Sequence, residues 1–92
     1  MSTSSQSIVE MISNALAQDQ VSDHEFSKLL RIADGMIENV EEGRPLEKAL
    51  SETFGSFDYE AWADEDHSSK PNDNKQVLAF INGYLTHMFD AV

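Results

Sequence analysis

The chain of 92 residues contains no cysteine. Disulfides, thiolate metal sites and cysteine nucleophiles are therefore excluded, and such a composition is compatible with the reducing cytoplasm. The first seven residues, MSTSSQS, lack the basic stretch and the long apolar run of a signal peptide. No apolar run approaches the length that a bilayer crossing needs. We therefore expect a soluble cytoplasmic protein that does not bind a membrane.

Basic residues are scarce. Six Lys and Arg stand against 17 Asp and Glu, so the formal net charge is −11 at pH 7. Direct binding to nucleic acid or to an anionic membrane is unfavourable for such a chain, because phosphate groups attract Lys and Arg. An acidic surface attracts basic partners instead, and nucleic-acid-binding proteins are the largest class of these. The plainer interpretation is that the charge keeps the protein soluble.

The negative charge is concentrated in one third of the chain. Residues 45–73 contain eight acids and two bases, a net charge of −6, whereas residues 74–92 are neutral. Within the acidic third, the segment DYEAWADED at 58–66 places five carboxylates around Tyr59 and Trp62 without a single base. Solubility alone does not require this concentration, so the segment is a candidate recognition surface.

Strand patterns are also absent, because no segment alternates apolar and polar residues between turn signals. Apolar residues recur instead with helical spacing. Ser22 and Glu25 form a capping box, Val21 and Phe26 fit a hydrophobic staple, and Pro45 fits a first helical turn. We predict one all-α domain over the whole chain, a small bundle of four principal helices. The predicted helices span about residues 6–19, 23–42, 45–54 and 74–90.

Two features leave alternatives open. Residues 58–64 form either a short fifth helix, with Trp62 turned inward, or part of an irregular loop. The apolar face of the helix at 74–90 covers roughly half of its circumference. That helix is therefore either central in the bundle or in contact with another chain, as in a homodimer.

Neither a catalytic site nor a metal or cofactor site is predicted. The sequence lacks the nucleophile-elbow, zinc-protease and phosphate-loop motifs, and its three histidines are scattered. The four side chains of the DEDH run at 64–67 cannot all converge on one ion, because consecutive residues point in different directions. An EF-hand starting at Asp58 fails because its sixth position, which requires glycine, is Ala63. A helix-turn-helix DNA reader needs basic or amide side chains, whereas the polar face of the helix at 23–42 is mainly acidic.

These features predict a non-catalytic inhibitor that binds a protein handling DNA or RNA and blocks its basic nucleic-acid site. Two settings fit: a phage protein against host defence, such as an anti-CRISPR or anti-restriction protein, and an immunity protein that neutralises a nuclease toxin. The chain resembles small acidic helical immunity proteins in size, charge and helical character, and no motif matches a family residue by residue. The alternative is an adaptor, chaperone or regulatory subunit that binds through apolar helix faces.

Two acidic surfaces are predicted to bind the partner. In the first, at 58–66, Trp62 packs inward while the carboxylates and Tyr59 face the partner. The second is one side of the helix at 23–42, where acids at i, i+4, i+7 and i+8 resemble the closely spaced charges of a nucleic-acid backbone. The predicted contact residues are Asp58, Tyr59, Glu60, Asp64, Glu65, Asp66, Asp34, Glu38, Glu41 and Glu42.

Overall fold

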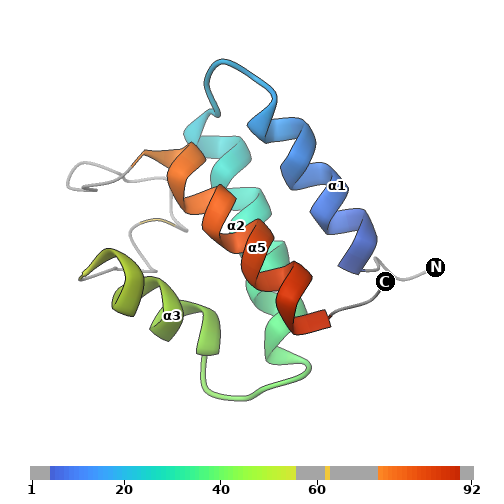
Figure 1. The fold of residues 1–92 in the computed structure, drawn as a ribbon, viewed down its shortest axis with the longest axis vertical. Coiled ribbons are helices and arrows are strands. Elements are labelled where there is room, and N and C mark those ends of the chain that lie inside the picture. Colours follow the sequence, from blue (N-terminus) through green and yellow to red (C-terminus); the bar gives the residue numbers. More distant parts are fainter. Residues whose placement is uncertain (1–4, 56–61, 63–72, 90–92) are drawn as a thin grey trace.

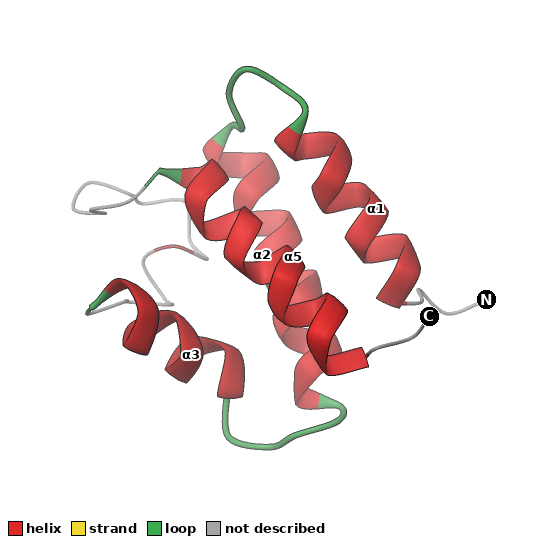
Figure 2. Ribbon diagram, viewed as in Figure 1, coloured by secondary structure: helices red, strands yellow, loops and turns green. Residues whose placement is uncertain are grey.

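The computed structural model describes residues 5–55, 62 and 73–89. Over these ranges the chain forms helices and connecting turns without a strand (Figure 2). The small all-α bundle predicted from the sequence is confirmed. The helices are α1 (Ser5–Leu16), α2 (Asp23–Glu38), α3 (Pro45–Phe54) and α5 (Asn74–Phe89).

The last helix, α5, is central among the described helices. It contacts α1, α2 and α3, and in Figure 1 it lies across α2 with α1 and α3 on opposite sides. The wide apolar face of α5 is therefore used inside this chain, and the central position that we considered for it is confirmed. The fully buried side chains of α5 are Val77, Leu78, Ile81 and Leu85.

One apolar cluster joins all four helices. Burying a Leu, Ile or Phe side chain stabilises a fold by roughly 1.5–3 kcal/mol, so this cluster supplies the main favourable contribution to the stability of the bundle. The buried side chains of the cluster are Ile8, Ile12, Ala15, Val21, Phe26, Leu29, Leu30, Ala33, Ile37, Leu46, Leu50, Trp62, Val77, Leu78, Ile81 and Leu85.

The starts of three helices follow the local signals in the sequence. The Ser22 hydroxyl accepts a 3.1 Å hydrogen bond from the backbone N–H of Glu25 and caps α2. Pro45 is the first residue of α3. The Asp73 carboxylate accepts a 2.8 Å hydrogen bond from the backbone N–H of Gln76 and caps α5 in the same way.

Two helices end before their predicted ends. Helix α1 ends at Leu16 rather than near Asp19, and α2 ends at Glu38 with Asn39 as its C-cap, four residues before the predicted end at 42. The last turn of α2 contains no basic residue. A longer α2 would place further carboxylates at the negative end of the helix dipole, which disfavours them.

The early end of α2 changes the surroundings of the residues that follow it. Val40, a large apolar residue, is 59% exposed. Its N–H bonds to the Ile37 carbonyl at 2.9 Å, and the N–H of Glu41 bonds to the same oxygen at 2.8 Å. Residues 39–44 thus form a turn rather than a further turn of helix, and we refer to them as the α2–α3 turn.

The predicted short helix over 58–64 lies outside the described residues, apart from Trp62. In the described ranges, the helices are all too short or too polar for a membrane crossing.

Candidate acidic binding surfaces

Trp62 attaches the middle of the acidic segment 58–66 to the core. Its side chain is 2% exposed, and its ring lies 4.9 Å from the Phe26 ring at an interplanar angle of 61°. This edge-to-face arrangement is a favourable geometry for two aromatic rings. The inward packing of Trp62 that we expected is therefore confirmed.

The backbone of Trp62 is held as well as its side chain. The hydroxyl of Ser27, a buried residue of α2, donates a 2.8 Å hydrogen bond to the Trp62 carbonyl oxygen. A buried hydrogen bond of this kind is expensive to break, because the carbonyl would lose its partner without gaining water. Phe26 and Ser27 together therefore fix residue 62 against one face of α2.

The remaining contact residues that we predicted in this segment lie outside the described residues. Along the sequence, five carboxylates fall within four residues of Trp62, so the anchor stands at the centre of the charge. The contact residues concerned are Asp58, Tyr59, Glu60, Asp64, Glu65 and Asp66.

The second predicted surface, a row of acids along α2, is not present as such. Asp34 is only 5% exposed, so its assignment to the outward face was wrong. Helix α2 contacts α1, α3 and α5 and is therefore covered over a wider arc than its apolar stripe alone indicated. Glu38 is exposed on the last residue of α2, whereas Glu41 and Glu42 are exposed on the α2–α3 turn and not on a helix.

The α2–α3 turn has a defined backbone and a net negative charge. Gly43 and Arg44 both have positive φ angles, of 90° and 59°, and Arg44 is the N-cap residue of α3. The Arg44 guanidinium lies 4.0 Å from the Glu38 carboxylate and 3.6 Å from that of Glu47. These ion pairs are partly exposed, so each contributes no more than about 1 kcal/mol to the stability of the fold.

Tyr84 on α5 lies close enough to the α2–α3 turn for the charge of Glu41 to affect its pKa. Partial burial raises the pKa of the Tyr84 phenol above its ordinary value of 10.0, and the carboxylate of Glu41 raises that pKa further. Both causes act in the same direction because burial and a neighbouring negative charge disfavour the phenolate.

A second face of α2 carries positive charge that the sequence analysis did not single out. Lys28, Arg31 and His24 are exposed, and together with Ser27 and Ile32 they line a hollow of about 320 Å³. The signal was present in the sequence, since positions 24, 28 and 31 follow the i, i+4, i+7 spacing of one helical face.

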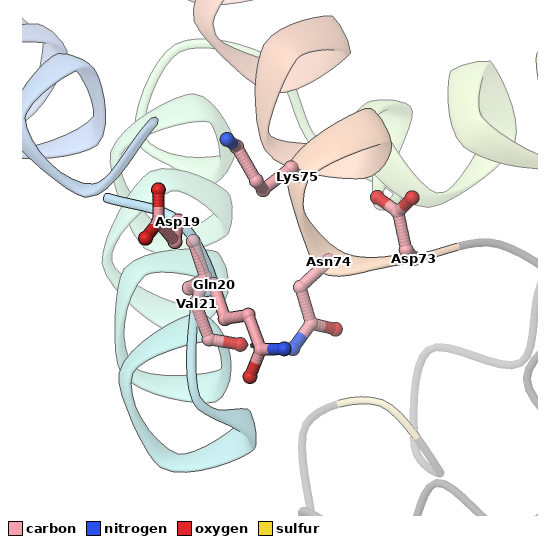
Figure 3. A pocket seen from close by; sticks show the side chains of 6 residues that line it. All are labelled: Asp19, Gln20, Val21, Asp73, Asn74 and Lys75. Atoms are coloured by element: carbon pink, nitrogen blue, oxygen red, sulfur yellow. Dashed lines mark hydrogen bonds between the residues drawn. The ribbon is translucent and has the colours of Figure 1, made fainter. Parts of the chain in front are cut away.

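Another hollow, of about 310 Å³, lies between the α1–α2 connection and the start of α5. Figure 3 shows the buried Asn74 reaching toward Val21, whose carbonyl it contacts at 2.9 Å through Nδ2, while Asp73 points away. Asn74 Nδ2 also donates to Asp23 Oδ1 at 3.1 Å, and Lys75 Nζ donates to the Gln18 carbonyl at 2.9 Å. These bonds fasten α5 to the connection, so we assign this hollow a structural role.

Among the described residues, His, Asp and Glu side chains do not gather into a group of three that could hold a metal ion. No known protein family, curated protein or solved structure matches the chain.

Proposed function

We propose that this protein is a non-catalytic acidic inhibitor that binds a nucleic-acid-handling protein and blocks its basic DNA or RNA site. The observation that carries the proposal is the attachment of Trp62 to α2 at the centre of the acidic segment 58–66. Two biological settings fit an acidic inhibitor of this kind. One is phage anti-defence, as an anti-CRISPR or anti-restriction protein, and the other is immunity against a nuclease toxin.

The attachment of Trp62 to the core supports a recognition role, because a charged segment that served only solubility would not need to be held in place. Charges that serve only solubility work equally well when spread over the surface. Holding the centre of a charged segment against the core reduces the conformational freedom that the segment loses on binding, which favours affinity. Carboxylates concentrated around a fixed point also accelerate association with a basic partner.

The alternative, an adaptor or homodimer that binds through apolar helix faces, is less well supported. It drew mainly on the wide apolar face of α5, and that face contacts α1, α2 and α3 within the same chain. We therefore favour the acidic segment 58–66 over the apolar helix faces as the site that binds the partner.

The proposal is tested with two triple variants of equal charge change. One reverses the acidic segment, with Asp64→Lys, Glu65→Lys and Asp66→Lys. The matched control reverses three exposed acids elsewhere, with Glu10→Lys, Asp19→Lys and Glu52→Lys. Each protein is used as bait in nuclease-treated host lysate, and the captured proteins are identified by mass spectrometry.

We expect the wild type and the control variant to capture the same basic protein and the segment variant to lose it. The helical circular-dichroism signal should be unchanged in all three proteins, because the three control sites are exposed and none of the six reversed acids belongs to the described apolar cluster. Equal loss in both variants would mean that only total charge matters, and equal retention would remove the segment 58–66 from the interface.

A further inference from the structure

We propose that the aromatic side chains of Phe54, Phe80 and Tyr84, together with the Glu41 carboxylate, bind an arginine side chain of the basic partner. We refer to the three rings as the aromatic row. This inference deepens the proposed function and rests on it for the basic character of the partner, but it concerns residues other than the acidic segment 58–66.

The aromatic row crosses the contact between two helices. Phe54 is the last residue of α3, and the centroid of its ring lies 5.8 Å from that of Phe80 on α5, at an interplanar angle of 75°. The Phe80 centroid lies 6.2 Å from that of Tyr84, four residues further along α5. Helices α3 and α5 contact each other, and Figure 1 shows α3 beside α5. The three rings therefore form one continuous strip from the end of α3 along α5.

The rings of the aromatic row are not used up by the core. All three pack against the buried apolar cluster, yet each side chain remains partly exposed. The face of an aromatic ring carries partial negative charge and attracts a cation that lies within about 6 Å of its centroid. Partly exposed rings therefore offer a partner both apolar area and an attraction for positive charge.

Glu41 adds a full negative charge beside the aromatic row. It is exposed on the α2–α3 turn, and its carboxylate acts on the pKa of the Tyr84 phenol. The basic residue of this turn, Arg44, lies within 4.0 Å of the carboxylates of Glu38 and Glu47 instead. Within the described ranges, no cation of this chain pairs with the Glu41 carboxylate. A cation from a partner would therefore meet a carboxylate whose charge is not already compensated.

These groups suit arginine better than lysine. A guanidinium is flat, stacks on aromatic faces and donates two parallel hydrogen bonds to a carboxylate, whereas an ammonium is a compact, strongly hydrated charge. The planes of the Phe80 and Tyr84 rings differ by only 31°, so a flat group that stacks on one ring is roughly parallel to the other. Arginine is also frequent in the sites of proteins that read nucleic acid, which connects this surface to the proposed function.

The test is an NMR titration of the full-length, ¹³C- and ¹⁵N-labelled protein at constant ionic strength, followed at the ring signals of the aromatic row. The probe is N-acetyl-argininamide. N-acetyl-citrullinamide, which has nearly the same shape without the charge, and N-acetyl-lysinamide, which has the charge without the flat group, are the comparison probes.

The wild type is compared with Glu41→Gln and with Tyr84→Leu, which removes the ring and keeps an apolar side chain. Glu10→Gln makes the same charge change at an exposed position on α1 and is the matched control. Circular dichroism checks that Tyr84→Leu is folded. Glu41→Gln changes only an exposed side chain, so it tests the proposal even if Tyr84→Leu does not fold.

We expect saturable shifts of the aromatic row with the arginine probe, weaker binding of the lysine probe and no saturable shifts with the citrulline probe. Glu41→Gln and Tyr84→Leu should each weaken binding of the arginine probe by about threefold or more, and Glu10→Gln should not. Equal binding of the citrulline or lysine probe, unchanged binding in Glu41→Gln, or an absence of saturable shifts in the row would overturn the proposal.

Capture from lysate separates this proposal from the proposed function. The bait with Glu41→Gln and Tyr84→Leu is compared with the variant that reverses Asp64, Glu65 and Asp66. If only the segment variant loses the basic protein, the proposed function stands and the role of the aromatic row is overturned. If the wild type captures no basic protein, the proposed function fails, and the titration alone decides whether the row binds arginine.

Discussion

Single residues decide how the acidic segment is attached, and Ser27 is the most informative of them. Its hydroxyl is buried and donates to the Trp62 carbonyl at 2.8 Å. We expect Ser27→Ala to lower the free energy of unfolding by about 1–3 kcal/mol, because the buried carbonyl loses its donor. Urea denaturation followed by circular dichroism measures this change. Thr53→Ala, at an exposed position on α3, is the control and should change stability by less than about 0.5 kcal/mol.

Trp62 itself should contribute more than its hydrogen bond. Trp62→Ala removes a large side chain that is 2% exposed and packed edge-to-face on Phe26. We expect a loss of about 3–5 kcal/mol in the free energy of unfolding, and a clearly smaller loss for Trp62→Phe, which keeps an aromatic ring. An unfolding midpoint in urea that is the same for Trp62→Ala and the wild type would contradict the anchoring of this segment.

Tyr84 gives a prediction in pH. Burial and the charge of Glu41 raise the pKa of Tyr84 in the folded protein above the value of 10.0 that it has when unfolded. The unfolded chain therefore releases this proton first as the pH rises, and stability is lost above about pH 10. In a Tyr59→Phe background, Glu41→Gln should shift the tyrosinate absorbance titration of Tyr84 to lower pH. An unchanged titration would mean that the α2–α3 turn does not influence α5.

At the scale of whole elements, helices α2 and α5 are less stable than they could be, because each contains an exposed glycine. Gly35 in α2 and Gly83 in α5 are exposed, and an added Cβ at either position would meet no atom within 4 Å. We expect Gly35→Ala and Gly83→Ala to raise the free energy of unfolding by about 0.5–1 kcal/mol each. Gly55 is the contrasting case, because its φ of 85° at the end of α3 disfavours a side chain. Thermal unfolding should show opposite signs for Gly55→Ala and the other two.

Helix starts were predictable because their signals are local. Ser22 with Glu25 and Pro45 act through their own backbone neighbours, and the structure places them as capping rules require. Helix ends were harder, since the end of α2 at Glu38 reflects unfavourable charge at its C-terminus rather than a clear stop signal. The burial of Asp34 was not predictable, because it depends on how three other helices cover α2.

At the scale of the whole molecule, the sequence determines the net charge but predicts only in part where the charged and aromatic residues lie in the fold. The inward position of Trp62 followed from its hydrophobicity, whereas its partners Phe26 and Ser27 come from a helix more than 30 residues away. The exposed pair of cations on α2, Lys28 and Arg31, was not predicted, because the net charge of a segment does not show how its charges divide between the faces of a helix.

We propose that the acidic segment 58–66 occupies a basic nucleic-acid site of the partner, and competition tests this proposal most directly. The partner is captured on immobilised wild-type protein from nuclease-treated lysate and then challenged with a DNA or RNA oligonucleotide, beside an uncharged polymer of similar size and a rise in salt. We predict that the oligonucleotide and the salt release a basic nucleic-acid-handling protein and that the uncharged polymer does not. A partner that stays bound under all three conditions would contradict the claim.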